Sequence, residues 1–195
     1  GRRATLMQQF RDKDCLLVVR GAGPPADNRE FRQDNDFWYL TGVSTPSAVL
    51  VLEPREGREW LLVPPVDPGS ERWVGDLIDP AEAQKITGIE NCLPLGRGGR
   101  DGAWSGLSKL LGDLAKRHKN FYTPLEPAEN WMMSRDLASE AVEHMGADPF
   151  DERLSRERQF AQKLRDELGV KVESLSSVMD ALRLVKTPEE LEAMR

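Results

Sequence analysis

Three uninterrupted apolar runs stand out in the first third of the chain, at residues 15–19, 48–52 and 60–63. Their length, four or five residues, is typical of β-strands. The second and third runs are joined by the polar segment 53–57, which contains Pro54 and Gly57 and predicts a hairpin. Because the runs do not alternate with polar residues, we expect strands that are covered on both faces.

The rest of the chain alternates helical patterns with short apolar runs. Apolar residues recur at helical spacing in 2–10, 107–114, 131–145, 154–168 and 178–185, and strand-like runs fall at 93–95, 121–122 and 170–175. One short helix is marked at both ends, because Asp79 and Pro80 offer an N-cap and a first-turn proline and Gly88 ends the pattern. Strands and helices that alternate over the whole length predict an α/β fold.

Two aromatic features do not follow from this pattern alone. Residues 31–42 (FRQDNDFWYLTG) run from a charged start into three adjacent aromatic side chains. We expect a capped turn that leads into a strand, with Phe37 and Tyr39 facing the core. Trp73 lies in a proline-rich irregular segment, where its ring either folds back onto the core or is presented to a partner.

The last residues carry a helix-start signal. Thr187, Pro188 and Glu190 fit a capping box with proline at the first helical position. The apolar residues that follow amount to about two turns, and an isolated helix of that length is marginal. We therefore expect residues 1–186 to form one domain and 187–195 to begin the first helix of a second; a frayed tail is the alternative.

Composition excludes several classes of function. The chain has 195 residues, with 27 Lys and Arg against 33 Asp and Glu, and its net charge of −6 disfavours sequence-independent binding to nucleic acid. No apolar run approaches the roughly 18–20 residues of a membrane span. Cys15 and Cys92 fall in strand-like segments and are expected to be buried thiols in a reducing compartment, although a disulfide is also open.

The sequence shows no complete catalytic or metal-binding constellation. Its two histidines, His118 and His144, are 26 positions apart and are expected at surface or helix-end sites, not as metal ligands. The charged residues 156–158 predict a solvated helix face. The glycine-rich segment 96–102 lacks the ending of a phosphate-binding loop and is expected to be a surface loop. We therefore predict no catalytic residue and no metal ligand in this chain.

Three motifs, in order along the chain, resemble one family. Residues 31–42, followed by Pro46 and the run 48–52, resemble the N-terminal domain of Xaa-Pro aminopeptidase (aminopeptidase P). The sequence Arg72-Trp73-Val74-Gly75 resembles that family's Trp-x-Gly loop. Residues 182–191 (LRLVKTPEEL) with Arg195 resemble the hinge into its catalytic domain.

The resemblance implies an α/β fold of the creatinase/prolidase N-terminal kind, a mixed β-sheet flanked by helices. It also implies that catalysis belongs to a following "pita-bread" domain. There, two Asp, one His and two Glu bind two divalent metal ions, usually manganese. A metal-bridging hydroxide attacks the carbonyl before proline in peptides that have proline in the second position.

For this domain itself, the resemblance implies oligomer contacts, in a dimer or a tetramer, and part of the wall of a neighbouring protomer's active-site cleft. By motif position, Trp73 matches the family tryptophan that reaches the neighbouring cleft. Asp27 matches an acidic residue before the Arg-Gln motif, with a spacing one residue shorter. We expect Asp27 to attract the substrate ammonium and Trp73 to form an apolar wall.

Two other functions are weighed against a cytoplasmic Xaa-Pro aminopeptidase. One is a peptidase-like module that binds proteins without catalysis, with residues 27–38 and the Trp73 loop as its contact surface. The other is a prolidase, which cleaves Xaa-Pro dipeptides. Activity of the complete protein on dipeptides and on longer peptides distinguishes the three functions.

Overall fold

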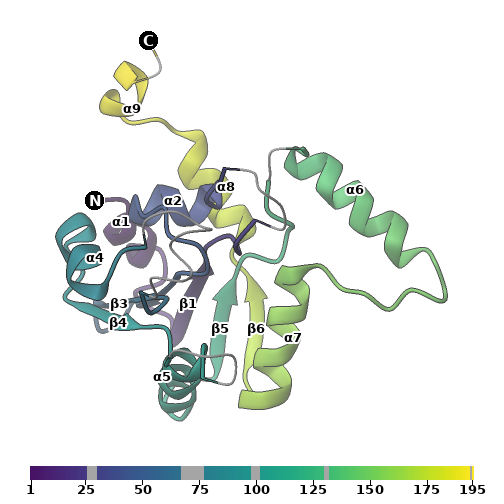
Figure 1. The fold of residues 1–195 in the computed structure, drawn as a ribbon, viewed down its shortest axis with the longest axis horizontal. Coiled ribbons are helices and arrows are strands. Elements are labelled where there is room, and N and C mark those ends of the chain that lie inside the picture. Colours follow the sequence, from purple (N-terminus) through teal and green to yellow (C-terminus); the bar gives the residue numbers. More distant parts are fainter. Residues whose placement is uncertain (26–29, 67–76, 98–101, 130–131, 194) are drawn as a thin grey trace.

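We describe the protein from a computed structural model, which describes residues 1–25, 30–66, 77–97, 102–129, 132–193 and 195. These residues form one six-stranded sheet in the order β4-β3-β2-β1-β5-β6 (Figure 1). The strands are β1 (Cys15–Arg20), β2 (Val49–Glu53), β3 (Arg58–Val63), β4 (Asn91–Pro94), β5 (Asn120–Thr123) and β6 (Lys171–Ser174). The α/β prediction is confirmed.

The sheet is mixed. Strands β1, β2 and β3 pair antiparallel, and the predicted hairpin is the β2–β3 pair, in which Val51 faces Trp60. Strand β4 pairs parallel with β3, while β5 pairs parallel with β1 and β6 with β5. The parallel register sets Cys15 beside Asn120. The carboxyl ends of β1, β5 and β6 therefore lie at the same end of the sheet.

Helices cover both faces of this sheet (Figure 1). The helices of the described residues are α1 (Arg2–Gln8), α2 (Asn35–Thr41), α4 (Pro80–Thr87), α5 (Ser105–Ala115), α6 (Arg135–Gly146), α7 (Arg156–Leu168), α8 (Ser176–Leu184) and α9 (Pro188–Ala193). Apolar residues of α1, α2, α4 and α8 pack with Leu17 and Val19 of β1 on one face. Residues of α5 and α7 pack with Leu16 and Val18 on the other. Helix α6 extends away from the sheet.

The local capping signals are confirmed. Asp79 and Glu82 form a capping box at the start of α4, and Gly88 ends that helix with φ +71°. At the start of α9, Thr187 N donates to Glu190 Oε2 (2.8 Å) and Glu190 N donates to Thr187 Oγ1 (3.3 Å). Such boxes satisfy backbone donors that have no partner within the helix.

The strand predicted at 37–40 is wrong. Residues 35–41 form α2, whose N-cap is Asp34 and whose C-cap is Gly42 in the left-handed conformation with φ +68°. Phe37 and Leu40 are buried, whereas Trp38 is 49% exposed. The burial thus follows a helical period instead of an alternating one.

Candidate binding cavity and charged network

A single buried side chain, Gln33, closes the loop between β1 and α2 at its base. Its Oε1 accepts a hydrogen bond from Ala22 N (2.7 Å), and its Nε2 donates to Val43 O (3.1 Å) and Thr45 O (2.9 Å). A Cβ on Gly21 would lie 2.8 Å from that Oε1, so the close approach requires glycine. Gln33 thereby joins the two ends of the loop to the turn that follows α2.

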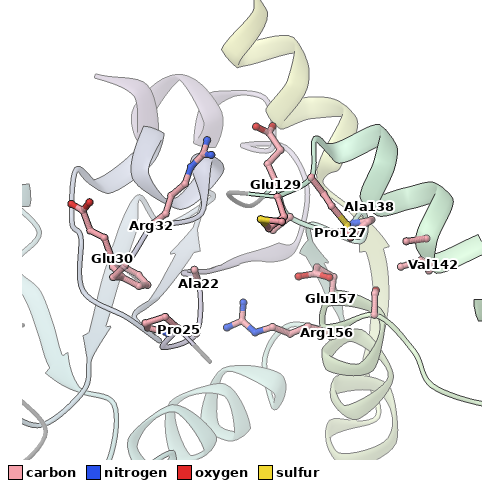
Figure 2. Close-up of a pocket in the computed structure, with 17 residues that line it drawn as sticks. Ala22, Pro25, Glu30, Arg32, Pro127, Glu129, Ala138, Val142, Arg156 and Glu157 are labelled. Atoms are coloured by element: carbon pink, nitrogen blue, oxygen red, sulfur yellow. The ribbon is translucent and has the colours of Figure 1, made fainter. Parts of the chain in front are cut away.

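This loop borders a cavity of about 610 Å³ (Figure 2). Residues 22–25 and 30–32 of the loop form one wall, residues 127–129, 132–133 and α6 form another, and the start of α7 forms the base. Apolar residues predominate in the lining and include Pro25, Phe31, Met132, Met133, Ala138 and Val142. The cavity lies at the carboxyl ends of β1 and β5, the end of a parallel sheet where ligands usually bind.

The base of the cavity carries charge. The Arg156 side chain extends from α7 toward the loop in Figure 2, and its Nη2 donates to Gly21 O (2.8 Å). Burial lowers the pKa of Arg156, and Glu157 and Asp34 oppose this shift. The prediction of a solvated face at 156–158 is therefore wrong for Arg156 and Glu157, which line the cavity, and holds for exposed Arg158.

The two predicted site residues lie outside the described residues. Asp27 belongs to segment 26–29 and Trp73 to segment 67–76. Pro25 and Glu30, which flank the first of these segments, both line the cavity. The described residues on either side of segment 26–29 therefore border the cavity. The glycine-rich segment predicted as a surface loop falls largely in 98–101, also outside the described residues.

The charged start of the aromatic motif has a structural use that the sequence did not reveal. Asp34 caps α2 by accepting from Phe37 N (2.8 Å), and burial raises the pKa of Asp34 to about 6. Asp36 is buried and pairs with Arg183 Nη1 (2.8 Å) and Arg135 Nη2 (3.4 Å). Burial raises the pKa of Asp36, and the two guanidinium groups oppose that rise.

The network continues beyond Asp36. Asn35 Nδ2 donates to Glu129 Oε2 (2.5 Å), and Glu129 Oε1 also lies 3.5 Å from Arg183 Nη2. Arg135 pairs with Asp180 of α8 as well. Helix α2 thus holds the start of α6, the 127–129 segment and α8 together. The sequence signal was an acidic residue, Asp36, at the helix start, but its partners Arg135 and Arg183 lie far along the chain.

Helix α2 also holds the end of α8. Tyr39 donates from its hydroxyl to Leu182 O (3.0 Å). The Arg2 guanidinium stacks 4.4 Å from the centroid of the Tyr39 ring and pairs with Glu190 of α9 at 2.5 Å. These contacts fix the direction in which the chain leaves the sheet.

A second charged group lies at the opposite end of the sheet. His118 follows α5, as the helix-end prediction has it, but its side chain is buried. Its Nδ1 lies 2.5 Å from Asp14 Oδ1, and its Nε2 lies 2.6 Å from Glu53 Oε1. Glu53 is 0% exposed and also pairs with Arg58 at 2.7 Å. His144 is exposed, as predicted.

The described residues offer binding surfaces more than reacting groups. Within these ranges, no three His, Cys, Asp or Glu residues are placed to hold a metal ion. Burial raises the pKa of Cys15 to about 11 and also raises that of Cys92, the direction opposite to a nucleophilic thiol. Both cysteines are free; Cys15 is buried as predicted, whereas Cys92 is only partly buried.

Comparison with known proteins agrees on one family. The family model described as "Aminopeptidase P, N-terminal domain" matches residues 1–119. Xaa-Pro aminopeptidase 3 of Mus musculus is 28% identical over 172 residues, which cover 85% of this chain and 28% of that protein. Intermediate cleaving peptidase 55, mitochondrial, of Arabidopsis thaliana is 26% identical over 165 residues, covering 85% and 26%. This chain thus spans little more than a quarter of these relatives.

Solved structures share the fold. Icp55 from Saccharomyces cerevisiae aligns with a TM-score of 0.65 at 21% identity, over 99% of this chain and 37% of that one. Aminopeptidase PepP from Pseudomonas aeruginosa aligns with a TM-score of 0.64 at 23% identity, over 99% and 39%. The fold predicted from the resemblance, a mixed sheet flanked by helices, is therefore confirmed.

Proposed function

Because this chain belongs to the family of aminopeptidase P N-terminal domains, we propose that it is the non-catalytic N-terminal domain of a metal-dependent Xaa-Pro aminopeptidase. The parent enzyme removes the N-terminal residue from peptides that have proline in the second position. The family match over residues 1–119 carries this proposal, and the relatives named Xaa-Pro aminopeptidase support it.

In this proposal the chemistry lies in a following domain. That domain holds two divalent metal ions, manganese by preference, which polarise the peptide carbonyl and supply the attacking hydroxide. The acidic and histidine residues described here suit other tasks, since Asp36, Glu53 and His118 are engaged in ion pairs within the fold. Residues 1–186 form the N-terminal domain, and 187–195 begin the first helix of the catalytic one.

The N-terminal domain contributes to oligomerisation, in a dimer or tetramer, and shapes the active-site cleft of a neighbouring protomer. Asp27 attracts the ammonium group of the substrate, and Trp73 provides an apolar wall. The cavity lined by Pro25 and Glu30 supports this role, because its apolar lining and the charged groups at its base suit an extended peptide that carries charge.

Replacing Trp73 tests the cleft role in the complete enzyme. Trp73→Ala is expected to lower kcat/KM for Xaa-Pro peptides about tenfold, or about 1.4 kcal/mol, since an apolar wall of the substrate site is lost. The melting temperature stays unchanged. In the same assay, Asp27→Asn raises KM because the attraction for the ammonium group is lost.

Phe150→Ala is the matched control, because that ring is 93% exposed and lies outside the cavity lining. It is expected to keep wild-type kinetics. Wild-type kinetics for Trp73→Ala as well would remove the cleft role from the proposal.

The 195-residue chain alone is expected to hydrolyse nothing. Purified chain with Mn²⁺ is assayed on an Xaa-Pro tripeptide and on an Xaa-Pro dipeptide, alongside the complete enzyme. Hydrolysis by the chain alone would contradict the proposal that catalysis belongs to the following domain. For the complete protein, preference for the tripeptide supports an aminopeptidase, preference for the dipeptide indicates a prolidase, and no turnover indicates a binding module.

We propose the cytoplasm as the compartment. Two free cysteines suit a reducing environment. In the part of the chain that the structure describes, none of the helices has the length and apolar content to cross a bilayer. One relative is named as a mitochondrial protein, so cell fractionation of the complete protein is the measurement that decides.

A further inference from the structure

Arg20 lies on the face of β1 whose other residues belong to the hydrophobic core. It is the last residue of the strand and follows Leu16 and Val18 at the two-residue period of a strand. Leu16 and Val18 are fully buried beneath α5 and α7. The strand period therefore directs the Arg20 guanidinium toward the layer formed by these two helices.

The guanidinium is held by aromatic rings and not by a carboxylate. Its central carbon lies 4.5 Å from the centroid of the Phe160 ring and 5.7 Å from that of Trp104. The Nε atom is buried without a hydrogen-bond partner. The ion pairs of the described residues do not include Arg20, and Glu157 is the carboxylate near enough to act on its charge.

The surroundings of Arg20 also disfavour the charged form of its side chain. Burial, followed by the nearby Arg156 guanidinium, lowers the pKa of Arg20 to about 10, and Glu157 opposes the shift only in part. Buried charge is costly unless it is paired. An anion bound to this guanidinium would offset both the free-energy cost of its burial and its repulsion by Arg156.

Arg20 also lines a cavity of about 250 Å³ between α5 and α7. The two helices lie at the same end of the molecule in Figure 1. Apolar side chains make up most of the lining, namely Trp104, Leu107, Leu111, Phe160, Leu164 and Leu168. Lys163 and Glu167 line it as well, and their opposite charges pair with each other at 3.5 Å. The volume is just below the ~300–1,000 Å³ of sites for drug-sized ligands, so it suits a smaller molecule.

We propose that the cavity between α5 and α7 binds a small monocarboxylate with an apolar tail, the carboxylate on the Arg20 guanidinium and the tail between the helices. A guanidinium matches a carboxylate in geometry as well as in charge. The apolar walls exclude small hydrophilic anions. The site is distinct from the cavity lined by Pro25 and Glu30 and from the peptidase role, and none of its lining residues also lines that cavity.

The carboxylate can come from a free aliphatic acid or from the C-terminus of a peptide. The test titrates hexanoate and, separately, N-acetyl-glycyl-leucine into the isotope-labelled 195-residue chain. We expect saturable shifts of the Trp104 indole signal and the Leu164 amide signal in nuclear magnetic resonance spectra. Hexanamide, the uncharged analogue, should bind at least tenfold more weakly than hexanoate.

Arg20→Met removes the charge and keeps an apolar side chain of similar length. In this variant we expect hexanoate and hexanamide to bind equally, whereas Lys109→Met, at an exposed position of α5 outside the lining, keeps the tenfold preference. Binding of only one probe identifies the source of the carboxylate. The absence of saturable shifts with either probe, or equal binding of acid and amide by the wild-type chain, overturns the proposal without recourse to the variant.

Discussion

Asp34 and Asp36 lie two positions apart at the start of α2, yet only Asp36 of the two is paired with guanidinium groups. Asp36 is neutralised by Arg135 and Arg183. Asp34 instead accepts a backbone hydrogen bond from Phe37, and burial raises the pKa of Asp34 to about 6. The cap needs only the acceptor oxygen and not the negative charge. Near neutral pH, the ionised Asp34 side chain therefore lowers stability.

Asp34→Asn is expected to remove part of the pH dependence of unfolding. Between pH 3.8 and about 6 the native state holds a proton that the unfolded state has lost, so the free energy of unfolding falls as the pH rises. The loss is at most about 3 kcal/mol, at about 1.4 kcal/mol per pKa unit. The amide keeps the cap and cannot ionise, so urea denaturation between pH 4 and 7 should show a flatter profile.

Asp166→Asn, at an exposed position of α7, is the control and should retain the wild-type profile. An Asp34→Asn profile as steep as that of the wild type would show that other groups produce the dependence.

At the scale of the element, α2 shows why the strand prediction at 37–40 was wrong. Phe37, Trp38 and Tyr39 have side chains that favour strands. Asp34 and Gly42, however, bracket them as N-cap and left-handed C-cap. The burial of Phe37 and Leu40 against the core then decides in favour of a helix. The two capping residues were visible in the sequence and outweigh the strand preference of the aromatics.

Features that depend on residues close together in the sequence could be predicted elsewhere in the chain, whereas contacts between distant residues could not. The N-cap at Asp79 and the capping box at Thr187 depend on residues at most three positions apart and were predicted correctly. The pair of Asp36 with Arg183 joins residues 147 positions apart, and no periodicity reveals it. The same holds for the cavity, whose walls come from distant segments. Asp27 and Trp73 came only from the family resemblance, and their roles stay predictions.

Tyr39→Phe is expected to loosen the end of α8. The change removes the 3.0 Å hydrogen bond to Leu182 O and keeps the ring, so unfolding should become easier by about 1 kcal/mol. Amide hydrogen exchange should accelerate at the end of α8, around residues 180–186, more than in β1 or β5.

Tyr122→Phe is a matched control, because it removes the same hydroxyl group from a tyrosine that lies in β5. Equal protection of α8 in the wild type and in Tyr39→Phe would indicate that α8 is held by its apolar face alone.

At the scale of the whole molecule, the two ends of the sheet have different character. The end where β1 and β5 finish borders the large cavity. The other end holds Glu53 among His118, Arg58 and Arg117, in contact with Asp14 through His118. This second group joins the start of β1, the β2–β3 turn and the end of α5. Its position far from the cavity favours a structural role.

His118→Leu is expected to destabilise the fold by about 3 kcal/mol at pH 7. Glu53, with no exposed surface, loses one partner, and breaking a buried pair costs about 3–5 kcal/mol. The lower value applies because Arg58 and Arg117 remain beside Glu53. Urea denaturation measures the change.

His144→Leu provides the comparison, since an exposed substitution of this kind should stay within about 0.5 kcal/mol of the wild type. If the two variants are equally stable, the buried His118 side chain does not contribute to the free energy of unfolding.

The order of the strands has a consequence for self-association. In the sheet formed by the described residues, β4 and β6 are the two outer strands, and each is four residues long. Strand β4 ends in Pro94, which has no amide hydrogen to donate, and β6 carries the Lys171–Glu173 pair. Short outer strands with proline or charge resist edge-to-edge aggregation. Copies of this domain should therefore meet through helices and loops, and the sheet should not extend from one copy into the next.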